Sequence, residues 1–222
     1  MLGKKMEKPD FTKQGMLDTL AKLHAAGVPG AHALAERTKA AEAAVRSEPI
    51  SEQESQNLWT ESFAVGFAKD FLGFEILDIE QNGDILSPHR IGNKSCDLLC
   101  KDDEGNEIFV ETKDNSGDLL RAESSGISGY TPPTQKQVND WIATKVYQSI
   151  KKGANLLIAR IPTYSPAFTP LREEDINFEI FRDYTIRNEI CVNISIDIPP
   201  HFRGIWFFRN GAQVFYKVLR SK

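Results

Sequence analysis

The chain has 222 residues, 41% of them hydrophobic and 26% charged, with a formal net charge of −4. This composition is typical of a globular protein, and no apolar run reaches the ~18 residues that a membrane-spanning helix needs. The slightly acidic balance excludes a protein that coats nucleic acid by positive charge alone.

The N-terminal segment and the cysteine content predict a cytoplasmic protein. The N-terminal Met1–Lys5 segment is charged, but no apolar stretch follows it, so we expect neither a secretory signal nor a membrane partner. Cys96, Cys100 and Cys191 fit neither a disulfide framework nor a zinc motif. Cys96 and Cys100 are four apart in a strand-like segment, which predicts that both face the same side of a sheet.

Residues 1–50 are rich in alanine and contain the turn-forming glycines Gly27 and Gly30 around Pro29. Leucines spaced three apart over 17–23 predict one short helix, and residues 34–45 predict another. Pro49 ends this part because proline disfavours helix in the residue before it. We expect a small, detached helical N-terminal extension.

A longer helix is predicted from Ser51, with Glu54 completing a capping box, to Leu72, where Gly73 supplies the stop. On a helical wheel, Glu61 falls within the apolar arc. A carboxylate directed at a core is costly unless it is paired or binds a metal. The opposite, polar arc contains Ser62, Gly66, Lys69, Asp70 and Gly73.

Three strands, a helix and a fourth strand follow. Strands are predicted over 74–80, 95–101 and 107–113, with a turn over 102–106 between the last two. After a long loop, Thr131-Pro132-Pro133 opens a helix that reaches Lys152. Residues 154–161 are continuously apolar, as in a strand buried on both faces. The tail, 171–222, is predicted to be β-rich, with an alternating strand over 190–198 and a hairpin turn at Arg209-Asn210-Gly211.

Three charged residues on the hairpin 95–113 carry the candidate chemistry. Folding at Gly105 brings Asp97 opposite residue 111 or 112, so that a regular register or one bulge places Asp97 and Glu111 on one face. Two adjacent carboxylates repel each other, and a divalent cation removes that conflict. Their oxygens suit Mg²⁺, with Mn²⁺ as a substitute. Lys113, two residues on, can reach an attacking water or a phosphate oxygen.

The series Asp97-x13-Glu111-Thr112-Lys113, on a hairpin between two helices, resembles the PD-(D/E)XK nuclease superfamily. The resemblance implies an α/β fold with a restriction-endonuclease-like αβββαβ core over 51–161, within a domain of 51–222. It also implies that Asp97 and Glu111 hold the metal and that Lys113 assists the water. Glu61 matches a glutamate that recurs on the first helix. Gln137, with Gln135 as the other candidate, matches a glutamine found on the helix after the lysine. Cys96 stands where the named motif has proline.

The leading hypothesis is a magnesium-dependent endonuclease that hydrolyses phosphodiester bonds, with DNA favoured over RNA and a homodimer as one possible state. A second hypothesis is a toxin domain that cleaves tRNA or DNA and has an immunity protein as its partner, to which a detached N-terminus would be suited. A third is a non-catalytic binding or assembly module of the same fold. Asp102 to Gly105 is read as a plain turn, and the four histidines lack zinc spacing.

Overall fold

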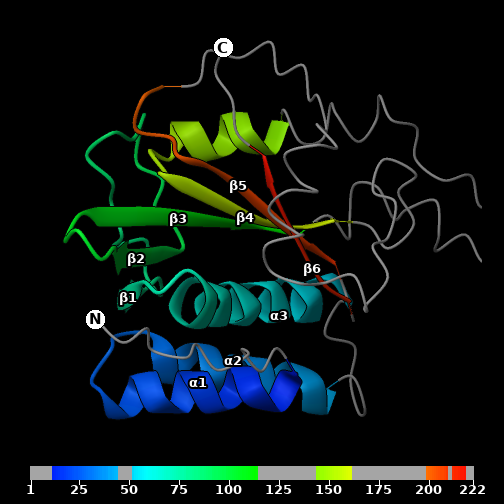
Figure 1. The fold of residues 1–222 in the computed structure, drawn as a ribbon. Coiled ribbons are helices and arrows are strands. Elements are labelled where there is room, and N and C mark those ends of the chain that lie inside the picture. Colours follow the sequence, from blue (N-terminus) through cyan, green and yellow to red (C-terminus); the bar gives the residue numbers. More distant parts are fainter. Residues whose placement is uncertain (1–11, 45–51, 115–143, 162–198, 210–211, 219–222) are drawn as a thin grey trace, which may run out of the picture.

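The computed structural model describes residues 12–44, 52–114, 144–161, 199–209 and 212–218. Within them the protein has a mixed α/β fold, with one sheet between helices on its two faces (Figure 1). This confirms the α/β class expected from the sequence. No helix in these ranges is long and apolar enough to cross a membrane.

The strands of the described residues form one six-stranded sheet in which spatial order follows chain order, β1 to β6. The first three strands form an antiparallel meander, β4 is parallel to β3, β5 is parallel to β4, and β6 returns antiparallel to β5. The strands are β1 (Glu75–Ile79), β2 (Leu98–Lys101), β3 (Glu107–Lys113), β4 (Leu156–Ile161), β5 (Gly204–Arg209) and β6 (Ala212–Val218).

The helices lie in two groups. Helix α3 (Glu52–Gly66), which continues as a π-helical turn (Phe67–Phe71), covers one face of the sheet, and α1 (Lys13–Ala25) and α2 (Ala31–Ala44) pack on α3. A helix over 144–151 lies on the opposite face (Figure 1). Gly73, with φ of +75°, follows the end of the π-helical turn, as the sequence predicts.

The N-terminal helices share one hydrophobic core with α3 and the sheet. Met16, Leu20 and Leu34 are buried in the same cluster as Phe67 and Val110. The expectation of a detached extension is therefore wrong: α1 and α2 bury apolar side chains against α3. The toxin hypothesis loses the support that it drew from a detached N-terminus.

The polar arc predicted for α3 is partly buried because α1 and α2 pack against it. Ser62 is fully buried, and its hydroxyl lies 2.9 Å from the Thr38 hydroxyl of α2, so each polar group satisfies the other. Gly66 is also buried, with a side-chain carbon of Met16 next to it. A helical wheel separates polar from apolar residues of one helix. It contains no information on other helices, here α1 and α2, that cover the polar side.

The two described cysteines do not face the same side. Cys100 belongs to the main core, whereas Cys96 belongs to a second cluster with Ile85, Phe109 and Ala154. The reason is that β2 begins only at Leu98, so the alternation predicted from residue 95 does not hold. Burial raises the pKa of both thiols to about 12, which makes them unreactive packing residues.

Other predicted boundaries agree closely with the structure. Strand β3 covers the predicted residues, β1 and β4 are shorter by one or two residues at an end, and the tail hairpin is formed by β5 and β6. The described part of the predicted 131–152 helix is helical over 144–151. The predicted strand over 190–198 lies outside the described residues.

Candidate active site at the β2–β3 hairpin

The backbone places Asp97 beside Glu111 through an irregularity just before β2. Leu98 pairs with Val110, and the regular pairing of β2 with β3 ends there, one residue after Asp97. The Asp97 N–H also donates to the Val110 carbonyl at 3.0 Å, so two successive residues face one residue of β3, as in a β-bulge. The Asp97 carbonyl in turn accepts from the Glu80 N–H at 3.0 Å. Asp97 is thus held on both sides.

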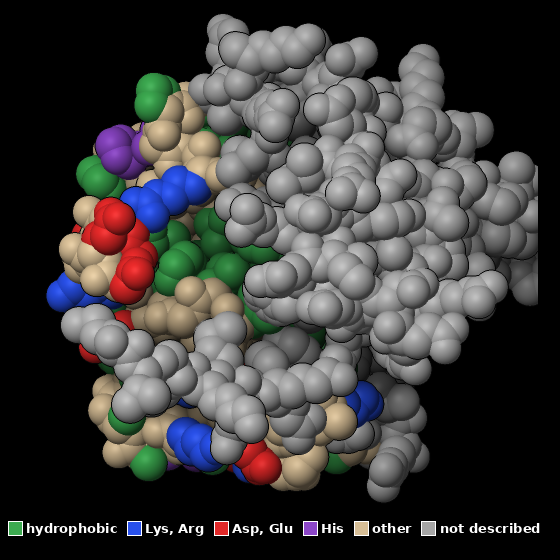
Figure 2. All heavy atoms as spheres, in the orientation of Figure 1, with side chains coloured by type: hydrophobic (Ala, Val, Ile, Leu, Met, Phe, Trp, Pro, Cys, Tyr) green, Lys and Arg blue, Asp and Glu red, His purple; other side chains and the backbone are tan. Residues whose placement is uncertain are grey.

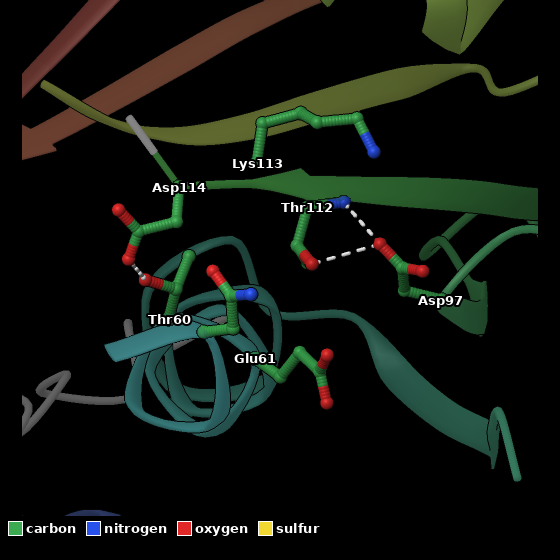
Figure 3. A pocket seen from close by; sticks show the side chains of 7 residues that line it. Thr60, Glu61, Asp97, Thr112, Lys113 and Asp114 are labelled. Carbon is green, nitrogen blue, oxygen red and sulfur yellow. Dashed lines mark hydrogen bonds between the residues drawn. The ribbon is translucent and has the colours of Figure 1, made fainter. Parts of the chain in front are cut away.

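The Asp97 side chain has one fixed oxygen and one oxygen turned toward other charges. Oδ2 accepts hydrogen bonds from the backbone N–H of Thr112 at 2.6 Å and from its hydroxyl at 2.8 Å (Figure 3). Oδ1 lies 3.7 Å from the ammonium of Lys152. The two Thr112 bonds orient the carboxylate and leave Oδ1 available to a cation.

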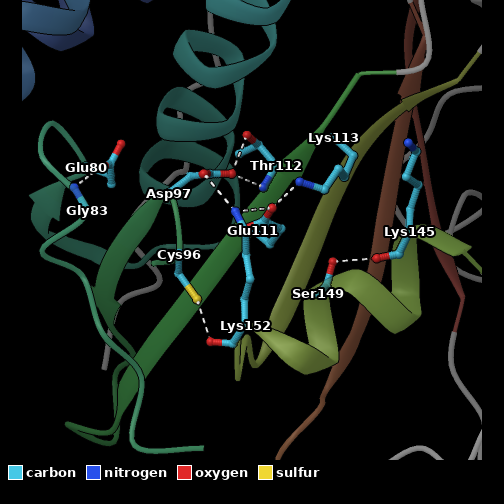
Figure 4. Close-up of polar contacts among 10 residues, drawn as sticks. All are labelled: Glu80, Gly83, Cys96, Asp97, Glu111, Thr112, Lys113, Lys145, Ser149 and Lys152. Atoms are coloured by element: carbon cyan, nitrogen blue, oxygen red, sulfur yellow. Dashed lines mark hydrogen bonds and ion pairs between the residues drawn. The ribbon is translucent and has the colours of Figure 1, made fainter. Parts of the chain in front are cut away.

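Glu111 is fully buried, and its two oxygens differ in the same way (Figure 4). Oε1 accepts from the ammonium groups of Lys113 and Lys152, the second at 2.6 Å. Oε2 is buried and finds no hydrogen-bond partner within the described part of the chain. A buried carboxylate oxygen without a partner is costly, and a bound cation is one way to satisfy it.

Burial and charge make this cluster unusual. Burial and the neighbouring Asp97 raise the pKa of Glu111 to about 7, against the opposing effect of Lys113 and Lys152. Burial disfavours the charge on Lys152, but Asp97 and Glu111 outweigh it and raise the Lys152 pKa. The two carboxylates therefore draw positive charge, which protons, lysines or a metal ion can supply.

Glu61 of α3 approaches Asp97 and Lys113 across a cavity beside the hairpin. It lines a cavity of about 240 Å³ together with Asp97, Thr112 and Lys113, and with Asn57, Thr60 and Asp114 (Figure 3). Burial raises the pKa of Glu61 to about 7, and Asp97 adds to the effect. The predicted position of Glu61, directed inward from the helix, is thus matched by a polar cavity rather than by an apolar core.

This raised pKa predicts the pH dependence of stability. The native state holds the Glu61 proton more tightly than the unfolded state. The contribution of this proton to the stability of the fold is therefore fully present below about pH 4.5 and is lost as the pH rises through 7. Between pH 5 and pH 8 we expect the free energy of unfolding, measured with denaturant, to fall by roughly 2 kcal/mol less in Glu61→Gln than in wild type. Glu107→Gln, an exposed change on β3, serves as the control. Parallel pH profiles for wild type and Glu61→Gln would contradict a buried, protonated Glu61.

The rim of the cavity is braced by an ion pair that the sequence did not suggest. The buried Asp114, just after β3, accepts from the Thr60 hydroxyl at 2.7 Å and from the Arg160 guanidinium at 2.8 Å. These bonds join α3, the end of β3 and β4. They fix the wall next to Lys113, since each partner comes from a different element.

The structure therefore brings together four of the five predicted site residues: Asp97, Glu111, Lys113 and Glu61. The fifth, Gln137, lies outside the described residues, as does Gln135. Lys152 was missed. It stands before Gly153 at the predicted end of a helix, and no local pattern distinguishes it from a solvent-exposed lysine.

The donor set suits a hard cation. Asp97 and Glu111 offer carboxylate oxygens on facing segments, and Glu111 Oε2 is the orphaned buried atom that an ion would satisfy. Among the described residues no group of three or more His, Cys, Asp or Glu side chains forms a ready-made metal cage. Mg²⁺ fits such a site, because it takes one or two carboxylates, keeps several waters and binds substrate phosphate.

Comparisons with protein-family models, with curated proteins and with solved structures found no match to this chain. The function is therefore inferred from the residues of the site and their geometry.

Proposed function

We propose that the chain is a metal-dependent nuclease of the PD-(D/E)XK type that hydrolyses phosphodiester bonds. The observation that carries the proposal is the convergence of Asp97 and buried Glu111 beside Lys113, with one Glu111 oxygen unpartnered among the described residues. The order of elements around the site supports it: α3, β1, β2, β3, the helix over 144–151 and β4 follow the αβββαβ order of that superfamily's core.

In this proposal each side chain has a defined task. Asp97, oriented by Thr112, and Glu111 would hold the cation. When bound there, Mg²⁺ would neutralise charge at the phosphate and lower the pKa of a water. Lys113, which lines the cavity, moves from Glu111 to the attacking water or a phosphate oxygen. Glu61, across the cavity, accepts a hydrogen bond from a water or takes up its proton.

We propose DNA as the substrate, with RNA as the alternative that the same assay tests. On the face shown in Figure 2, acidic and basic side chains of the described residues are interspersed and form no single basic stripe. Among these residues, substrate contact is therefore centred on the cavity and its cation rather than on a broad field of positive charge.

The test is incubation of the protein with plasmid DNA and with total RNA, each with Mg²⁺, with Mn²⁺ or with chelator. We expect cleavage with either metal and none with chelator. Lys113→Ala is expected to slow cleavage by about 10²- to 10⁴-fold, because it removes the group that assists proton transfer. Lys101→Ala, at an exposed lysine on β2, is the matched control and should cleave as wild type. Cleavage in chelator at the wild-type rate would contradict the proposal.

One observation favours a second function. The ammonium groups of Lys113 and Lys152 already neutralise Asp97 and Glu111, as in a purely structural ion-pair cluster. A nuclease-fold module that binds a partner without catalysis would need no more than this. Calorimetry in which the protein binds neither Mg²⁺ nor Mn²⁺ would favour the binding module over the nuclease.

A further inference from the structure

Lys152 is anchored at a tight turn that leads its side chain into the candidate active site. Its backbone N–H donates to the backbone carbonyl of Gln148 at 3.2 Å, and its own carbonyl accepts from the Cys96 thiol at 3.5 Å. The next residue, Gly153, has φ of +74°, and a Cβ there would lie 2.5 Å from the backbone nitrogen of Arg90. The turn is therefore closely packed, and the base of Lys152 is fixed in space.

The Lys152 ammonium lies between the two carboxylates assigned to the metal (Figure 4). Nζ is 2.6 Å from Glu111 Oε1 and 3.7 Å from Asp97 Oδ1, and the side chain is 19% exposed. Lys113 contacts Glu111 as well, but it comes from β3 and lines the cavity. Lys152 lies in the turn just after the helix over 144–151, and it does not line the cavity.

We propose that Lys152 is a built-in counter-ion of the metal centre, which stabilises the metal-free carboxylates and has to leave them when a divalent cation binds. This inference rests on the proposed function. With both lysines in place, the two carboxylates are already neutralised, so a divalent ion would face two ammonium groups within a few ångströms. Repulsion between like charges at that distance is strong in a partly buried site.

Lys152, rather than Lys113, is the group that withdraws. It touches both carboxylates and so occupies the space between them, whereas Lys113 is placed on the cavity side where substrate enters. A lysine has a flexible four-carbon stem, which lets the ammonium move away while the anchored backbone stays in place. Lys152 is therefore a positioning residue, which sets how tightly the site holds its cation.

The test compares Mn²⁺ binding by calorimetry with thermal unfolding of the metal-free protein. Lys152→Met keeps the stem and removes the charge. We expect it to bind Mn²⁺ about tenfold more tightly, or better, because one ammonium no longer competes, and to unfold at a lower temperature without metal. A residue that merely supported the site would give the opposite sign for metal affinity. Lys152→Arg, which keeps the charge, is expected to restore wild-type affinity and stability.

Lys151→Met is the matched control. Lys151 is the exposed last residue of the helix over 144–151, and its ammonium lies 4.3 Å from the centre of the Tyr147 ring. Its loss should leave Mn²⁺ affinity unchanged and remove only the small stabilisation of that cation–π contact. Suppose that wild type binds Mn²⁺ and Asp97→Asn does not. If Lys152→Met then binds Mn²⁺ no more tightly than wild type, this inference alone is overturned. Failure of wild type and Lys152→Met alike to bind Mn²⁺ would overturn the proposed function and the inference together.

Discussion

Asp97→Asn is expected to reduce phosphodiester cleavage by about 10²- to 10⁴-fold, because the cation that this carboxylate holds supplies several kcal/mol of charge stabilisation. The fold should survive the change. The asparagine carbonyl oxygen can still accept the two hydrogen bonds from Thr112, and the backbone bonds to Val110 and Glu80 do not involve the side chain. Initial rates at saturating Mg²⁺, together with a thermal melt, separate lost chemistry from lost folding.

Asp103→Asn is the matched control for this prediction. Asp103 is exposed in the turn between β2 and β3, so the same acid-to-amide change is made on the same hairpin, away from the cavity. It should cleave at the wild-type rate. An Asp97→Asn enzyme as fast as this control would show that Asp97 does not hold a catalytic cation, and the nuclease proposal would fall with it.

The hairpin itself was predictable from the sequence because its determinants are local. Gly105 has φ of +86° in the turn, and the apolar run Ile108–Val110 marks the strand that follows it. Together these fix the register from Leu98 to Lys101, and Asp97 lies directly before this paired part. Local turn chemistry is therefore sufficient to predict the hairpin and that Asp97 lies near Glu111 within it.

The bulge at Asp97 and the approach of Lys152 depend on contacts between distant segments. The Asp97 backbone is held by Glu80 and Val110, which lie in other strands or at their ends. Lys152 reaches Glu111 across 41 positions of sequence, through a turn that packs against the Cys96 thiol. Hydrophobic periodicity reports only which face of an element is buried, so it could not show which lysine enters the site.

The same limit applies to the N-terminal helices, where the turn between them was predictable and its docking was not. The sequence marks Gly27 and Gly30 equally as turn residues, and both have positive φ, +82° and +75°. In the structure they differ. A Cβ on Gly27 would meet no atom of the described residues within 4 Å, whereas a Cβ on Gly30 would lie 2.8 Å from the Ile79 carbonyl carbon and closer still to its oxygen.

Gly30→Ala is therefore expected to cost roughly 3 to 4 kcal/mol in the free energy of unfolding, the sum of left-handed strain and of the clash with β1. Gly27→Ala bears the strain alone and should cost about 1 kcal/mol. Denaturant unfolding of both variants measures the difference. Near Gly30 the Ile79 N–H donates to the Pro29 carbonyl at 3.2 Å, so a clash there loosens the contact by which the helices cover the edge strand β1. Equal costs for the two variants would mean that the turn does not dock on β1, and that α1 and α2 are held by α3 alone.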